Sequence, residues 1–138
     1  APVAFSPGFP MSTAVTRGVR VEVRTRYLAE HSDPAQGHWM HAYQVTITND
    51  GDRPVQLLSR HWIITNSHGV EEHVQGAGVV GEQPSLNPGE SYRYTSGCPI
   101  DTSMGTMHGT YQMAMLDDGE RFDADVAPFT LAEPYALN

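Results

Sequence analysis

Hydrophobic and polar residues alternate along most of the chain, which is typical of β-strands that bury one face. Residues 19–24 alternate valine with arginine or glutamate, and residues 43–48 alternate Tyr, Val and Ile with Gln and Thr. The same two-residue period recurs in 91–95, 107–116 and 121–126. No segment sustains the 3.6-residue period of an amphipathic helix. We therefore expect an all-β protein.

Turn-forming residues separate the alternating segments. The runs NDGD at 49–52, SHG at 67–69 and DDG at 117–119 combine residues that favour tight turns. Residues 75–89 and 96–105, rich in glycine, proline and serine, are expected to be loops. About seven strands separated by turns predict an antiparallel β-sandwich of the immunoglobulin-like class. Fibronectin type III is the nearer analogue, because a single cysteine cannot form the antibody-type disulfide.

The length of 138 residues is that of one domain. Residues 1–16 show little apolar periodicity and are expected to be a flexible arm, which leaves 17–138 as the folded domain. The first ten residues have no basic segment and contain three prolines, so we do not expect a signal peptide. No apolar run reaches the roughly 18 residues needed to cross a membrane. With Cys98 as the single cysteine, a cytoplasmic location is expected.

The net charge of −8 indicates which kinds of partner the protein can bind. All eight basic residues are arginines, and they are scattered rather than clustered. An acidic surface repels phosphate backbones, so we expect no general nucleic-acid binding. A local arginine site for one anionic group is compatible with this charge.

Several motifs between residues 56 and 113 resemble the ApaG family. They read QLLSRHWIIT at 56–65, GAGVVGEQP at 76–84, LNPGE at 86–90, YTSG at 94–97 and GTYQM at 109–113. The resemblance covers about residues 18 to 138 and implies a fibronectin-type-III-like sandwich. It links the chain by family name to cobalt resistance and magnesium efflux, and by gene neighbourhood to dinucleoside tetraphosphate hydrolysis. Eukaryotic copies of the domain occur in F-box and polymerase-interacting proteins, and no catalytic residue set comes with the resemblance.

The glycines at 76, 78 and 81 match the spacing of a dinucleotide-binding fingerprint. That motif needs a helix directly after the glycines, whereas Glu82, Gln83 and Pro84 follow here, so a Rossmann site is rejected. A weaker interpretation remains, in which the loop N–H groups form an anion-binding nest assisted by Arg60 and His61. The alternative is that the glycines only let the loop cross between the sheets.

Residues 59–62, with the sequence SRHW, form the densest polar and aromatic cluster. On a strand, Arg60 and Trp62 share one face, and Ser59 and His61 share the other. Arg60 stacked near an aromatic ring would suit a recognition surface. Alternatively, Trp62 is the core tryptophan and Arg60 forms a structural ion pair with an acid such as Glu82.

Catalytic and metal sites find little support. His38 and His41 are three positions apart and His68 and His73 are five, so each pair would point to opposite faces of a strand. Cys98 lies in an expected loop with no histidine base tied to it. We therefore expect no enzyme activity, no cofactor and no specific metal site.

The sequence thus favours a non-enzymatic binding module that engages a protein partner or a small phosphate- or pyrophosphate-like anion. The candidate ligand-binding residues are Arg60, His61, Gly76, Gly78, Gly81 and Glu82. The alternative, carried by the family resemblance, is a cobalt or magnesium homeostasis factor that binds the metal directly. Neither nucleic acid nor membrane is an expected partner, and the chain is expected to be a monomer or a weak homodimer.

Overall fold

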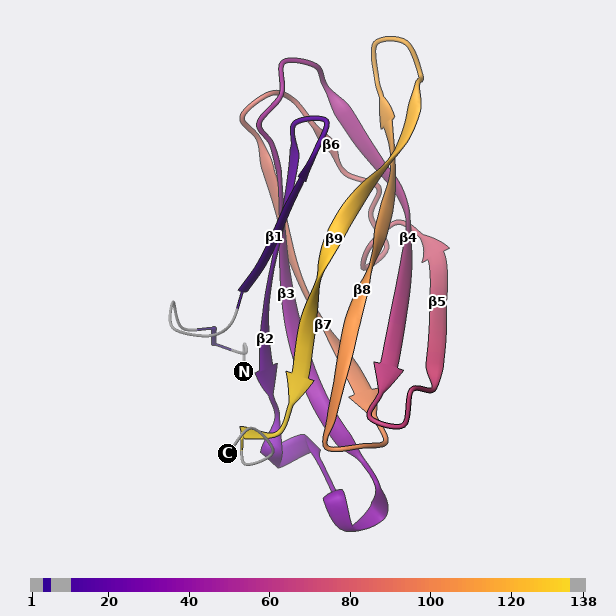
Figure 1. Ribbon diagram of the computed structural model, residues 1–138. Helices are drawn as coiled ribbons and strands as arrows, with labels where there is room; N and C mark the ends of the chain where they lie inside the picture. The colour runs from indigo at the N-terminus through magenta and orange to yellow at the C-terminus, as the bar shows by residue number, and fades with distance from the viewer. Residues whose placement is uncertain (1–3, 6–10, 135–138) are drawn as a thin grey trace.

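The computed structural model describes residues 4–5 and 11–134 and shows two antiparallel sheets packed face to face (Figure 1). One sheet has the order β1 (Met11–Thr16), β2 (Val19–Tyr27), β3 (Trp39–Asn49) and β7 (Ser91–Ile100). The other has the order β5 (Glu71–Ala77), β4 (Val55–Asn66), β8 (Met104–Met115) and β9 (Arg121–Ala132), and β6 (Ser85–Leu86) also pairs with β4. Two short 3-10 turns, η1 (Ala29–His31) and η2 (Pro34–Gln36), connect β2 to β3. The predicted all-β sandwich is confirmed.

The alternating residues meet between the sheets and form the core. The valines of β2 and the apolar residues of β3 from Ala42 to Ile47 are fully or almost fully buried. At the centre, Trp62 is 2% exposed and packs edge-on against Tyr43, Tyr111 and Phe129, with ring centroids 5.5 to 6.0 Å apart. Edge-on aromatic pairs at these separations add to the stability gained by burial. The interpretation of Trp62 as the core tryptophan is therefore confirmed.

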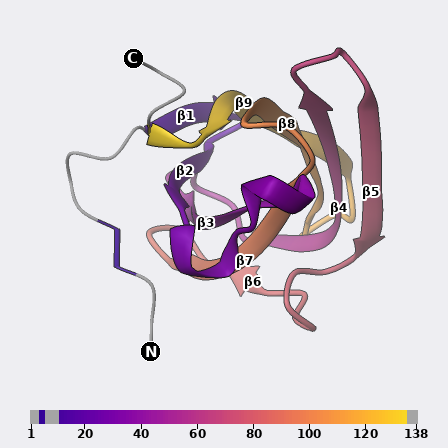
Figure 2. The same cartoon turned by 90° about the horizontal axis from the view of Figure 1, so that it is seen from below.

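The two long sides of the sandwich differ. On one side β9 contacts both β1 and β2, which closes the sandwich. On the other side the sheets end in β5 and β7, and Figure 2 shows β5 standing apart from β7. Within the described residues, both strands therefore have one edge without a partner strand.

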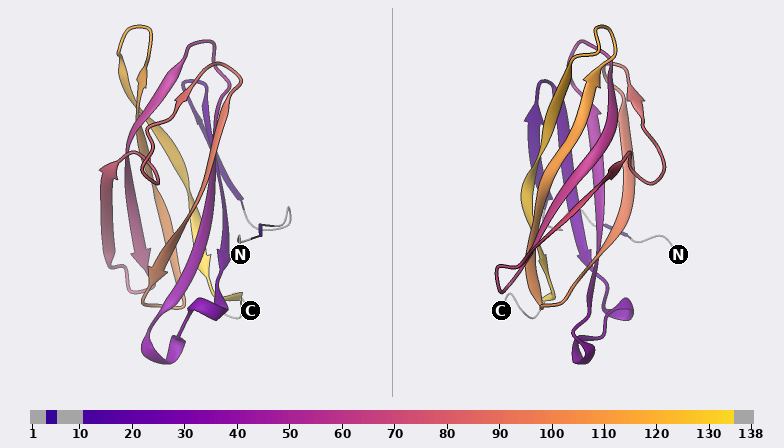
Figure 3. Two further views of the ribbon diagram at one scale, coloured as in Figure 1. Left: turned by 180° about the vertical axis from the view of Figure 1, so that it is seen from behind. Right: turned by 90° about the vertical axis from the view of Figure 1, so that its right-hand side faces the viewer.

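Two sequence expectations need correction. Met11–Thr16, assigned to the flexible arm, pairs with β2 along its whole length, so that prediction is wrong for these residues. Apart from residues 4 and 5, the rest of the expected arm lies outside the described residues. The expected loop 96–105 is mostly strand, because β7 continues to Ile100 and β8 begins at Met104 (Figure 3).

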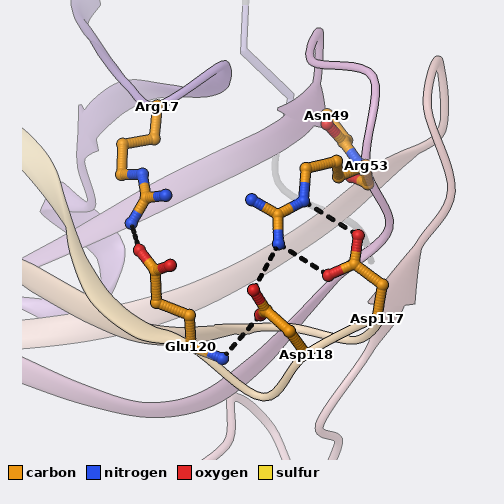
Figure 4. A network of polar contacts seen from close by, with 6 residues as sticks. All are labelled: Arg17, Asn49, Arg53, Asp117, Asp118 and Glu120. Carbon is orange, nitrogen blue, oxygen red and sulfur yellow. Dashed lines mark hydrogen bonds and ion pairs between the residues drawn. The ribbon is translucent and has the colours of Figure 1, made fainter.

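The end of the sandwich that carries the β3–β4 and β8–β9 turns is held by ion pairs (Figure 4). Arg53 donates from Nε and Nη2 to the two carboxylate oxygens of Asp117, at 2.8 and 2.6 Å, and also pairs with Asp118 at 2.9 Å. Arg17 pairs with Glu120. The hydrogen bond from Arg53 lowers the pKa of Asp117. These carboxylates thus serve turn structure, as the sequence predicted.

No helix among the described residues is long and apolar enough to cross a membrane.

Candidate functional site

A cleft opens between β5 and β7, on the side of the sandwich that no further strand covers. Its volume is about 210 Å³, and β3, β4, β5, β7 and β8 all contribute to its walls. The walls are apolar at Trp62, Ile64, Val74 and Met107, and polar at Arg60, Glu72 and Ser96. We call this the Arg60 cleft.

Arg60 enters the cleft because it lies two residues before Trp62 on β4, so both face inward. Its Nη1 donates to the carbonyl oxygens of Ala77 at 3.1 Å and Gly78 at 2.8 Å. Gly76 lies opposite Arg60 in the β4–β5 register, and a Cβ at Gly76 would be only 3.0 Å from Nη1. The glycine at position 76 therefore makes room for the guanidinium group.

The charge of Arg60 has no carboxylate partner within salt-bridge distance in the part of the chain that the structure describes. The alternative that Arg60 pairs with Glu82 is not what the structure shows, since Glu82 is exposed on the turn after β5. By contrast, Arg17, Arg20 and Arg53 each pair with a carboxylate. Arg60 is thus a half-buried cation held by neutral carbonyls.

Buried hydroxyl and thiol groups lie near this cation. The hydroxyls of Tyr94 and Tyr111 are hydrogen-bonded to each other, and burial raises the pKa of both phenols. Burial also raises the pKa of the Cys98 thiol to about 12, with a smaller contribution from Glu72. These groups are therefore neutral near neutral pH, and Cys98 is not a thiolate nucleophile.

Trp62, one of the residues that line the cleft, carries an unsatisfied hydrogen-bond donor. Its indole N–H is buried and has no hydrogen-bond partner among the described residues. Buried polar groups without a partner are uncommon.

The geometry of the turn that follows β5 explains the presence of Gly78 and Gly81. Gly78 donates its N–H to the carbonyl of Leu58, and Val79 and Glu82 exchange reciprocal backbone hydrogen bonds, all at 2.8 Å. The φ angles of Gly78 and Gly81 are positive, at +62° and +82°. A Cβ at Gly78 would lie 2.3 Å from the carbonyl oxygen of Glu82. The N–H groups of Gly78, Val79 and Glu82 are thus engaged within the protein and do not form an open nest.

His61 lies on the other face of β4, away from the cleft. Its Nε2 is 2.9 Å from Nδ1 of His73 and 3.3 Å from the side-chain nitrogen of Gln75. Sequence spacing relates His73 to His68, whereas the β4–β5 register brings His73 diagonally next to His61. The register follows from the hairpin turn at 67–69, which is the sequence signal that could have revealed this pair.

Of the six candidate residues, the structure brings three together. Arg60 and Gly76 are in contact, and Gly78 supplies a carbonyl to Arg60. His61 faces the opposite side, and Gly81 and Glu82 lie on the exposed turn. Across residues 4–5 and 11–134, no group of three or more His, Cys, Asp or Glu side chains is placed to hold a metal ion. The metal-binding alternative therefore gains no ligand set from these residues.

Comparisons with known proteins identify the family. The family model described as "DUF525: ApaG domain" matches residues 29–115. The chain is 53% identical over 120 residues to Protein ApaG of Pseudomonas putida, covering 87% of this chain and 94% of that protein. It is 51% identical over 128 residues to Protein ApaG of Anaeromyxobacter dehalogenans, covering 93% of this chain and all of that one.

A solved structure agrees with these matches. The crystal structure of a Bordetella pertussis protein described as ApaA is 49% identical and superposes with a TM-score of 0.81, covering 84% of this chain and 94% of that chain. The family model and the relatives together span most of the two sheets described above. This chain belongs to the ApaG family.

Proposed function

We propose that this protein is a non-enzymatic binding module whose Arg60 cleft receives an anionic group, carried by a protein partner or by a small phosphate-like anion. The observation that carries the proposal is the half-buried Arg60 guanidinium, held by two carbonyls with no carboxylate within salt-bridge distance among the described residues. A charged hydrogen bond to such a group contributes about 1.5–3 kcal/mol.

The charge of the whole protein limits which anions fit. With a net charge of −8, the surface repels extended polyanions, and the attraction is confined to the neighbourhood of Arg60. A single carboxylate or phosphate can approach Arg60 without placing further negative charge against the acidic surface. This supports a local anionic group rather than a nucleic-acid backbone.

The chemistry around Arg60 supports binding rather than catalysis. Covalent catalysis needs a nucleophile activated by a base or by a lowered pKa. Here burial raises the pKa of Cys98, Tyr94 and Tyr111, which is the opposite direction. The thiol that lines the cleft and the two phenols near Arg60 are thus not activated for reaction with a ligand.

Affinity capture with a matched pair of arginine variants tests the proposal. Arg60→Gln removes the cleft cation, and Arg121→Gln removes an exposed arginine at the start of β9, outside the cleft. We expect partners captured from a cell lysate by the wild type to be retained by Arg121→Gln and lost with Arg60→Gln. Identical capture by all three proteins would refute the role of Arg60. Thermal unfolding of each variant checks that the fold is intact.

A further inference from the structure

We infer that the ligand of the Arg60 cleft is an extended polypeptide segment that adds as a strand to the free edge of β7 and places a carboxylate on Arg60. This inference rests on the proposed function and specifies the partner. It combines the unpaired backbone of β7, the space beneath β5 and the charges that line the cleft.

The backbone of β7 provides the template. On one side β7 pairs with β3 continuously, from Ser91 opposite Thr48 to Ile100 opposite Trp39. On its other side, no strand of the described chain pairs with it. An unpaired edge presents a row of N–H and C=O groups to which a further strand can bond. Ten residues of β7 are long enough for such pairing.

The space for an added strand lies beneath β5. The order of the first sheet stops at β7, whereas the facing sheet continues past β4 to β5. Val74 faces inward on β5 and is only partly buried, although it packs against the core. A strand next to β7 would therefore lie under β5, and every second side chain would point into the cleft toward Trp62 and Val74. Figure 2 shows this open side from the end of the sandwich.

The charges of the cleft define the segment that fits. Arg60 lies opposite Gly76, and Glu72 faces the same cleft four positions earlier along β5. Val74 lies between these two positions. Because the side-chain period of a strand is two, a matching segment has a carboxylate at one position, an apolar residue two positions on and a basic residue four positions on, across roughly 13 Å.

A second copy of this chain does not meet that requirement. If two β7 edges paired, the inward-facing side chains of the added strand would be Tyr92, Tyr94, Ser96, Cys98 and Ile100. None of these carries a carboxylate for Arg60 or a cation for Glu72. The geometry therefore points to another polypeptide and not to the pairing of two β7 edges.

Synthetic peptides test the inference on the isotopically labelled full chain. The probe is a pool of seven-residue peptides with Glu, an apolar residue and Lys at alternating positions, Thr or Ser between them, blocked ends and both chain directions represented. We expect saturable amide shifts along β7, including Thr95 and Gly97, and in the Arg60 Nε–H signal. We expect affinity to fall at least roughly tenfold with Arg60→Gln and to be unchanged with Arg121→Gln, which lies on β9 and outside the cleft.

The mode of binding is tested by N-methylating alternate amides of the best peptide, which removes main-chain hydrogen bonds and keeps the side chains. A loss of at least roughly tenfold in affinity supports strand addition. Undiminished affinity of the N-methylated peptide, or no binding by any member of the pool, overturns it. If Arg60→Gln still abolishes capture from lysate in that case, the proposed function stands without strand addition. If peptides bind along β7 with the same affinity in Arg60→Gln as in the wild type, both the inference and the proposed function are overturned.

Two further arms complete the test. The carboxylate that contacts Arg60 can come from a Glu side chain or from the C-terminus of the peptide. Peptides that carry a free terminal carboxylate in place of Glu distinguish these two sources, because the peptide with the correct source binds more tightly. Glu72→Gln provides a readout that does not depend on the folding of an Arg60 variant. We expect Glu72→Gln to weaken the binding of peptides that contain Lys and to leave the affinity of peptides with Gln at that position unchanged. Equal effects on both would overturn the assigned register.

Discussion

His41 is the most deeply buried histidine of the described chain, at 1% exposure. It faces the ring of Tyr27 at a centroid distance of 5.4 Å, and its Nε2 has no hydrogen-bond partner among the described residues. Burial lowers the pKa of His41 from 6.5 to about 4. The folded protein therefore holds this side chain neutral under conditions in which the unfolded chain binds a proton.

This difference predicts a stability loss in mild acid. Below the unfolded pKa of 6.5, the unfolded chain gains a proton that the folded chain does not, so the free energy of unfolding falls as pH drops toward 4 and this contribution then levels off. Near pH 5 the loss from His41 is roughly 2 kcal/mol. Urea unfolding at about pH 7.5 and about pH 5 should show a smaller pH dependence for His41→Phe than for the wild type. An equal pH dependence of the free energy of unfolding in both proteins would show that His41 is not its cause.

The contact between Gly76 and Arg60 is the second residue-scale feature. Alanine at Gly76 would place Cβ 3.0 Å from Nη1 and push the guanidinium away from the carbonyls of Ala77 and Gly78. We expect Gly76→Ala to shift the Arg60 Nε–H resonance and to weaken ligand capture. Gly51→Ala, in the β3–β4 turn and outside the cleft, is the control, because its nearest non-neighbouring atom would be Asn49 Oδ1 at 3.3 Å. An unshifted Arg60 signal in Gly76→Ala would contradict this packing.

At the scale of elements, local alternation was enough to predict β2 and β3, and it failed where pairing is decided by distant residues. β1 has the sequence MSTAVT, with little apolar periodicity, and forms because β2 offers it an edge. The end of β7, SGCPI, contains glycine and proline but is held by pairing with β3. Such pairings depend on the sheet order, which no local pattern encodes.

The turn after β5 supports an element-scale prediction. Gly78→Ala forces a side chain into a positive φ and against the Glu82 carbonyl, so we expect a loss of roughly 1–3 kcal/mol in the free energy of unfolding. Gly81 also has a positive φ but has no atom within 4 Å of its Cβ position. Because asparagine tolerates this conformation, Gly81→Asn should cost less than about 0.5 kcal/mol. Equal stability of the two variants in urea unfolding would show that the turn can rearrange.

At the scale of the molecule, the open side of the sandwich decides which predicted residues form a site. The sequence placed Arg60 and Trp62 on one face of a strand and His61 on the other, and the structure agrees. It could not show that β5 and β7 border a cleft, because that depends on the order of strands in two sheets. For the same reason the glycine spacing suggested a nest, whereas the hydrogen bonds of Gly78, Val79 and Glu82 close the turn on itself.

The central claim, that Arg60 and not the glycine turn receives an anionic group, is tested most directly by an NMR titration. Inorganic pyrophosphate is added at millimolar concentration to the isotopically labelled protein, and the Arg60 Nε–H signal and the backbone amides are followed. We predict saturable shifts at Arg60 and at Ser96 and Gly97 across the cleft, which are absent in Arg60→Gln. Shifts confined to Val80 and Gly81, or no shift at Arg60, would contradict the claim.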